Sequence, residues 1–167
     1  FENPWLFFYK IKEYLMINNV LKLKLYQAIQ HKLNDTKLLI TSSLNDLTND
    51  AKNDTKSTAG DKHETGRAMM QHEQEKLRLQ LVELENQISF LQKINPENKA
   101  EKIQLGSIVQ TDKACFYITI AFGQIAIDDT NIFVISSIAP IAQQMLGKSI
   151  NDQFEMNGLT YTISAIV

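Results

Sequence analysis

Apolar residues recur at helical spacing through the first part of the chain. Residues 20–53 contain neither proline nor glycine, and their apolar positions follow one another mostly at steps of three and four. These positions are Leu25, Ile29, Leu33, Ile40, Leu44 and Leu47. Thr36 keeps the helical register across the longest gap in the series. The pattern predicts one long amphipathic helix.

A second helical pattern follows over residues 61–94. Its apolar positions alternate steps of four and three, and they are Leu77, Leu81, Leu84, Ile88 and Leu91. Each helix has about 30 residues and is therefore roughly 45 Å long. A narrow apolar stripe of that length must be covered by another helix, and the other arm is the nearest one available. The two segments predict an antiparallel coiled-coil hairpin, which Asn95-Pro96 closes because proline disfavours helical geometry.

A polar, glycine-punctuated break, STAGDKHETGRA at residues 57–68, separates the two helical patterns and places the hairpin tip near 55–66. It carries two carboxylates, Asp61 and Glu64, three residues apart. If the second helix includes them, both lie on one face and could serve the same cation. The same spacing just before a helix also fits an N-terminal capping box, worth about 1 kcal/mol. Both interpretations stay open, and from spacing alone the cap is the commoner.

Beyond Lys102 the pattern changes to β-branched and aromatic runs with partial alternation. The predicted strands are residues 107–110, 116–121, 133–136, 153–156 and 159–167. Asn157-Gly158 is a hairpin signal, because a type I′ turn needs positive φ at both central residues. Pro140 and Gly147 bracket a short helix. The C-terminal part is therefore predicted to be a small, mostly antiparallel sheet with one short helix, which makes the fold class α+β.

Three segments follow from these patterns. Residues 1–15, FENPWLFFYKIKEYL, are expected to be an upstream extension before a natural start at Met16. They have neither a basic start nor a small-residue cleavage site, so they make a poor signal peptide, and a cytoplasmic location is expected. Residues 16–95 form the predicted coiled-coil hairpin, and residues 96–167 form the predicted C-terminal domain.

Composition narrows the functional classes. The chain has 167 residues and 44% hydrophobic content, but no run approaches the roughly 20 apolar residues of a membrane span. A net charge of −2 argues against a free-standing nucleic-acid binder, so any nucleic acid is expected to be held by a partner. The single cysteine, Cys115, allows no intramolecular disulfide and lies in an apolar stretch, which predicts a buried, inert thiol.

A long helical hairpin with an acidic tip and a small strand-rich domain resembles the bacterial Gre transcription elongation factors. The tip sequence GDKHE at residues 60–64 is similar to the family's G-D-x-x-E pattern. LGSIV at residues 105–109 is similar to the family's opening strand, and Tyr161, Ile163 and Ile166 fit its closing strand. VISSIAPIAQQMLGKSINDQF at residues 134–154 resembles the family's I-S-x-x-S-P-x-G-x-A-L-L-G-K-x-x-G-D segment. The matching positions are Ile135, Ser136, Pro140, Leu146, Gly147, Lys148 and Asp152.

This resemblance implies that the hairpin enters the secondary channel of RNA polymerase, while an FKBP-like C-terminal domain docks at the channel's outer rim. Asp61 and Glu64 would help to hold a second Mg²⁺ and its attacking water beside the 3′ end of backtracked RNA. The protein would then lend ligands to the active site of another enzyme, without a complete site or a cofactor of its own. The residues expected to contact partners are Lys62 and Arg67 at the tip and Ser136, Pro140 and Lys148 in the C-terminal domain.

Departures from the family pattern keep other functions open. Ala139 stands where the family usually has Ser, Ala142 and Asn151 stand where it usually has Gly, and Thr65-Gly66-Arg67 replaces the usual Asn-Ala-Glu-Tyr. One alternative is a channel-binding regulator that does not promote cleavage. Others are an FKBP-like peptidyl-prolyl isomerase or chaperone module, and a scaffold whose coiled coil pairs with a second copy. The leading interpretation expects a monomer.

Overall fold

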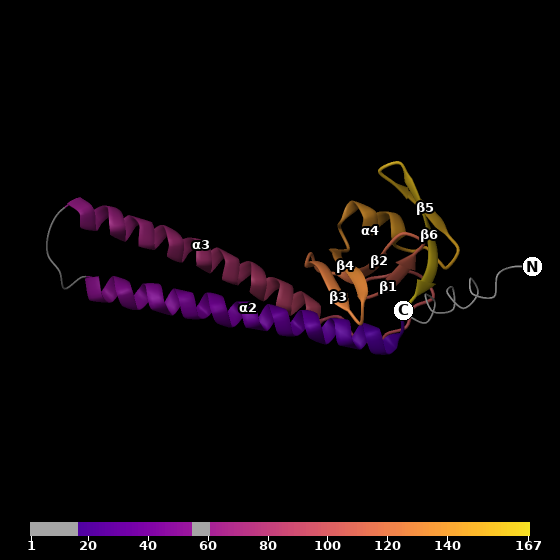
Figure 1. The fold of residues 1–167 in the computed structure, drawn as a ribbon, viewed down its shortest axis with the longest axis horizontal. Coiled ribbons are helices and arrows are strands. Elements are labelled where there is room, and N and C mark those ends of the chain that lie inside the picture. Colours follow the sequence, from indigo (N-terminus) through magenta and orange to yellow (C-terminus); the bar gives the residue numbers. More distant parts are fainter. Residues whose placement is uncertain (1–16, 55–60) are drawn as a thin grey trace, which may run out of the picture. The chain divides into compact units, whose positions relative to one another are not determined.

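The computed structural model describes residues 17–54 and 61–167, and the side chains of residues 17–51 and 64–167 (Figure 1). The predicted upstream extension and Gly60 of the tip motif lie outside the described residues. The chain divides into two compact units. The hairpin unit is Gln30–Ser89, and the sheet unit combines the residues up to Ile29 with Phe90–Val167. The domain boundary after residue 95 stays a prediction from sequence.

The two predicted helices are present with nearly the predicted bounds. Helix α2 is Asn19–Asp54 and helix α3 is Asp61–Gln92. The Asn18 side chain caps α2, because its Oδ1 accepts the backbone N–H of Leu21 at 2.8 Å. At the end of α3, the side-chain oxygen of Asn95 accepts the N–H of Glu97 at 2.9 Å, which forms a turn before the chain enters the sheet. No helix in the two described ranges has a segment long and apolar enough to cross a membrane.

Within the hairpin unit, α2 and α3 run antiparallel and side by side (Figure 1). Lys37 of α2 and Glu85 of α3 form an ion pair across the seam, with a nitrogen–oxygen distance of 2.7 Å. Leu33 and Leu84 are buried there, while Ile40 and Leu81 are only half-buried. The predicted helical hairpin is therefore confirmed, although the seam that two helices can bury is narrow.

The sheet unit contains six strands in the order β3-β4-β2-β1-β6-β5. They are β1 Ile108–Thr111, β2 Cys115–Thr119, β3 Gly123–Ile127, β4 Thr130–Ser136, β5 Gln153–Met156 and β6 Leu159–Ile166. All neighbouring strands pair antiparallel except β2 and β4. The turn between β5 and β6 is Asn157-Gly158, and both residues have positive φ, as predicted.

Strand β3 was not predicted from the sequence, and its presence changes one pairing. The chain leaves β2, forms β3 at the edge of the sheet, and returns through a tight turn in which Asp128 and Asp129 have φ of 47° and 64°. Strand β4 therefore lies between β3 and β2 and runs parallel to β2. The prediction of a mostly antiparallel sheet holds, with β2 and β4 as the parallel pair. Strand β3 was missed because GQIAI has weak β-propensity at Gly123, Gln124 and Ala126.

All five residues of β2 are buried, so both faces of the sheet are covered at this strand. Phe116 and Ile118 point to one face and join a core that includes Met145 of helix α4, Pro140–Met145. Cys115 and Tyr117 alternate with them and occupy the other face. Burial raises the pKa of Cys115 to about 12, which confirms the predicted buried thiol.

Helix α4 lies between Pro140 and Gly147, as these two residues predict. Pro140 occupies its first turn, where a missing N–H costs nothing. The N–H of Leu146 bonds the carbonyl of Ala142 at 2.9 Å, and Gly147 follows with φ of 80°. Two backbone hydrogen bonds of 2.8 Å then tie Gly147 and Lys148 to Ile103. The helix is thereby fixed to the segment that leads into β1.

Candidate functional site

The structure places the acidic pair of the tip motif at the start of α3. Since the helix begins at Asp61, positions 61 and 64 lie on the same side of its first turn. Glu64 and Arg67 are exposed. The side chains of Asp61 and Lys62 lie outside the described residues, so the capping-box and metal-ligand interpretations both remain predictions.

Gly66 lies inside α3, one turn from its start. A Cβ built at this position would meet no atom within 4 Å. The glycine therefore relieves no steric conflict, and it weakens the helix by about 0.5–1 kcal/mol relative to alanine. Among the described side chains, no group of three or more His, Cys, Asp or Glu residues is arranged to hold a metal ion. Asp61 is not one of those side chains.

The three predicted contact residues of the C-terminal domain lie before, at the start of and after α4. Ser136 ends β4, and its backbone oxygen accepts the N–H of Ala139 at 3.0 Å. Pro140 is exposed at the first position of the helix. Lys148 follows the helix, is half-buried and forms no ion pair with another described side chain. We call residues 136–150 the α4 surface. Its role in binding a partner stays a prediction.

Sequence reasoning missed Ile138, which lies on the α4 surface between Ser136 and Pro140. Its side chain is 82% exposed, the largest value among the described large apolar residues. One isoleucine in a short turn has no periodicity that would mark it. Only the turn geometry shows that it points to solvent.

Three buried polar groups were also missed. Lys22 is 2% exposed, and its Nζ donates to the carbonyl of Asn98 at 2.8 Å. Burial lowers the pKa of Lys22. The hydroxyls of Tyr117 and Thr119 are buried and have no hydrogen-bond partner among the described residues. Burial, with a smaller contribution from Tyr26 of α2, raises the pKa of Tyr117. None of these groups lines either cavity described below.

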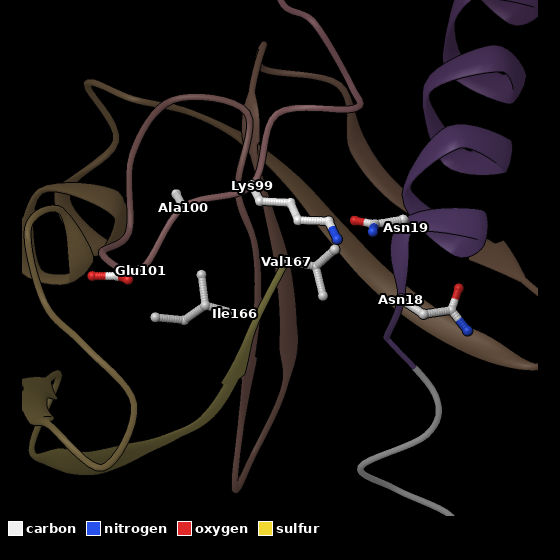
Figure 2. Close-up of a pocket in the computed structure, with 7 residues that line it drawn as sticks. All are labelled: Asn18, Asn19, Lys99, Ala100, Glu101, Ile166 and Val167. Carbon is white, nitrogen blue, oxygen red and sulfur yellow. The ribbon is translucent and has the colours of Figure 1, made fainter.

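The sheet unit has an open cavity of about 630 Å³ (Figure 2). It is lined by Asn18, Asn19, Lys99, Ala100, Glu101, Ile166 and Val167. Figure 2 shows the Lys99 side chain extending toward Asn19, while Glu101 points to the opposite side. The ammonium and the carboxylate thus offer separate polar contacts rather than a paired acid and base. No residue predicted as a site from the sequence lines this cavity.

The hairpin unit has a shallow groove of about 650 Å³ between α2 and α3. It is lined by Thr36, Ile40, Leu79, Gln80, Glu83, Leu84 and Gln87. Leu79 at its edge is 64% exposed. The groove is thus the open side of the narrow helical seam.

The fold defines an α+β protein in which a two-helix hairpin is combined with a six-stranded sheet unit. No protein-family model and no curated protein matches the sequence. Among solved structures, the transcription factor Gfh1 matches with 19% sequence identity and a TM-score of 0.34, over 82% of this chain and 92% of that chain. A likeness at this TM-score does not establish function.

Proposed function

We propose that this protein is a Gre-like transcription factor that binds RNA polymerase and inserts its hairpin tip into the secondary channel. One observation carries the proposal. Asp61 and Glu64, the two acids of the tip motif, belong to the first turn of α3, whereas the second family-like segment includes α4 in a different unit. A channel-entering factor needs two distinct regions, because one must reach the reacting RNA while another binds the polymerase surface.

The chemistry of the tip suits a role in phosphodiester hydrolysis. Mg²⁺ prefers oxygen ligands, keeps several waters, and often takes only one or two carboxylates from a single source. In two-metal hydrolysis one ion activates the attacking water and the other stabilises the leaving oxygen. Asp61 and Glu64, on one helical turn, would supply ligands to an ion that the polymerase also holds. Lys62 and Arg67 would contact RNA phosphates without reading sequence.

Cleavage of RNA in stalled, backtracked polymerase complexes tests this chemistry. The wild type is compared with a double variant, Asp61→Asn with Glu64→Gln, which keeps the shape of both side chains and removes their charges. We expect both proteins to bind and only the wild type to accelerate cleavage. Equal acceleration by the two proteins would contradict a metal-binding role for the pair.

A second candidate is a regulator that occupies the channel without promoting cleavage. It is favoured by Gly66, which weakens α3 directly after the acidic pair, where a catalytic tip would need a rigid support. Competition distinguishes it from the first candidate. Added protein would lower the cleavage produced by a cleavage-competent factor, and would do so without cleavage of its own.

A further inference from the structure

The groove of the hairpin unit leaves apolar side chains open to water on one side of the helical seam. Ile40 of α2 and Leu79 of α3 line this groove, and Leu79 is 64% exposed. Glu83 lines it as well, whereas Glu85 pairs with Lys37. Residues two apart on a helix point in nearly opposite directions, so the ion pair borders the other side of the seam. One side of the hairpin is therefore bordered by charge, and the other offers an apolar groove.

Two opposite charges flank Leu79 on the same face of α3. Lys76 comes three residues before Leu79 and Glu83 comes four residues after it, so the three side chains lie on one face within about two helical turns. Lys76 and Glu83 are both exposed. Lys76 contacts Glu73 at 3.4 Å, and Glu83 accepts the side-chain amide of Gln87 at 3.3 Å. Such long contacts between exposed groups are weak, which leaves both charges available to a partner.

We propose that the hairpin groove binds the same groove of a second copy of this chain, with the two α3 helices antiparallel. A two-fold axis between residues 79 and 80 would bring the two Leu79 side chains together and would place each Lys76 opposite Glu83 of the other copy. A parallel arrangement would instead oppose lysine to lysine and glutamate to glutamate. The order of the charges along α3 thus selects an antiparallel second copy as the occupant.

The length of the groove limits the strength of the pairing. Its lining on α3 extends from Leu79 to Gln87, which is about 12 Å of helix. Small interfaces of this kind form transient complexes, so the dimer is expected only at high protein concentration. Under the proposed function, pairing and channel entry would compete for the same hairpin. Pairing in solution requires no polymerase, so the inference is independent of that function and replaces the expected monomer.

Sedimentation velocity of the full-length protein alone tests the pairing. We expect a monomer at about 1 µM and a dimer at about 500 µM, with a dissociation constant on the order of 10–100 µM. Leu79→Asp should weaken the dimer by about tenfold or more, because it places two carboxylates at the axis. Leu38→Asp is the matched control and should stay within about twofold of the wild type. Leu38 is 69% exposed but lies two residues from both Thr36 and Ile40, and therefore opposite the groove.

Charge reversal tests the antiparallel arrangement. Lys76→Glu and Glu83→Lys should each weaken the dimer by about fivefold, because each single variant turns two attractive pairs into two repulsive ones. The double variant restores opposite charges and should return to within about twofold of the wild type. All of these positions are exposed, and unchanged circular dichroism spectra would show that the variants fold.

Three outcomes would overturn the proposal. A monomer at every concentration would exclude the pairing. A dimer that Leu79→Asp leaves intact would place the interface outside the groove. Failure of the double charge variant to recover would contradict the antiparallel arrangement. None of these outcomes affects the cleavage assay, so the proposed function stands or falls separately.

Discussion

The sheet unit and the hairpin unit are stabilised in different ways. In the sheet unit, β2 is buried on both faces, and Ile118 and Tyr117 are fully inaccessible. In the described part of the hairpin unit, only Leu33 and Leu84 are buried. Two paired helices cannot enclose a core, because each covers the other along one stripe only. The comparison indicates that folding free energy is concentrated in the sheet unit.

The open sides of the hairpin have a functional meaning under the proposed function. Leu38 and Leu39 on α2 are each 69% exposed, and Leu79 on α3 is 64% exposed. A helical pair with few buried contacts opens locally at low free-energy cost. A tip that enters a polymerase channel tolerates such opening when the surrounding channel supports it. Under the same proposal, the sheet unit would bind the polymerase surface and would need a fixed structure.

Truncation of one core residue in each unit should give the largest difference in lost stability between the two units. Ile118→Ala in the sheet unit is expected to lower the free energy of unfolding by about 3–4 kcal/mol, because it leaves a cavity in a closed core. Leu81→Ala in the half-buried seam should cost about 1–2 kcal/mol, since solvent fills the space. Urea denaturation followed by circular dichroism measures both. Equal losses would show that the hairpin is as tightly packed as the sheet.

Replacement of a glycine by alanine should change the stability in opposite directions in the two units. Gly106 has φ of 87°, and a Cβ built there lies 2.9 Å from Cγ2 of Ile94. Gly106→Ala should therefore destabilise the protein by about 1–3 kcal/mol. Gly66→Ala should stabilise it by about 0.5–1 kcal/mol, because Gly66 is helical and unobstructed. Thermal unfolding checks both variants, and a loss of stability in Gly66→Ala would contradict the account of the tip.

Removal of an unpaired hydroxyl should stabilise the sheet unit. Tyr117→Phe keeps the ring and deletes a buried oxygen that has no partner among the described residues, so a gain of about 1 kcal/mol is expected. Tyr161→Phe is the control, since Tyr161 is half-buried and its stacking on Phe154 is retained. A loss of stability in Tyr117→Phe would mean that the hydroxyl has a partner after all.

Removal of the ion pair in the hairpin should have the smallest effect on stability. Lys37 and Glu85 are each more than 40% exposed, so their interaction is screened by solvent. Glu85→Gln is expected to cost about 0.2–0.5 kcal/mol, and the difference should vanish in 1 M salt. Chemical denaturation at two salt concentrations measures it. A loss above 1 kcal/mol would indicate that charge, rather than the apolar seam, holds the helices together.

The long helices were predictable because period and punctuation agree over many residues. The sequence predicts helices over 20–53 and 61–94, and the structure has α2 at Asn19–Asp54 and α3 at Asp61–Gln92. Asn95-Pro96 follows closely after the end of α3. Short strands carry fewer residues of signal, which is why β3 and the parallel pairing of β2 with β4 were missed. The pattern of side-chain types along the chain also does not determine the order and direction of the strands in a sheet.

The candidate site residues also divide into those that the sequence predicts and those that it misses. Ser136, Pro140 and Lys148 are predicted from a family-like segment, and the structure places them at the end of β4, at the start of α4 and after α4. Ile138 was missed because exposure in a turn depends on backbone geometry. Lys22 was missed because lysine is almost always exposed, and its burial depends on the carbonyl of Asn98, 76 residues away in the chain.

Cross-linking from the hairpin tip tests the central claim most directly. Ala68 is exposed, and Cys115 is buried with its pKa raised to about 12, so a photoreactive thiol reagent would label Ala68→Cys selectively. In complexes with RNA polymerase, we expect cross-links from position 68 to the segments that line the secondary channel and active centre. Leu159→Cys, in the sheet unit, should give none there. Cross-links from position 68 that fall only on the outer polymerase surface, or that match those from position 159, would contradict channel insertion.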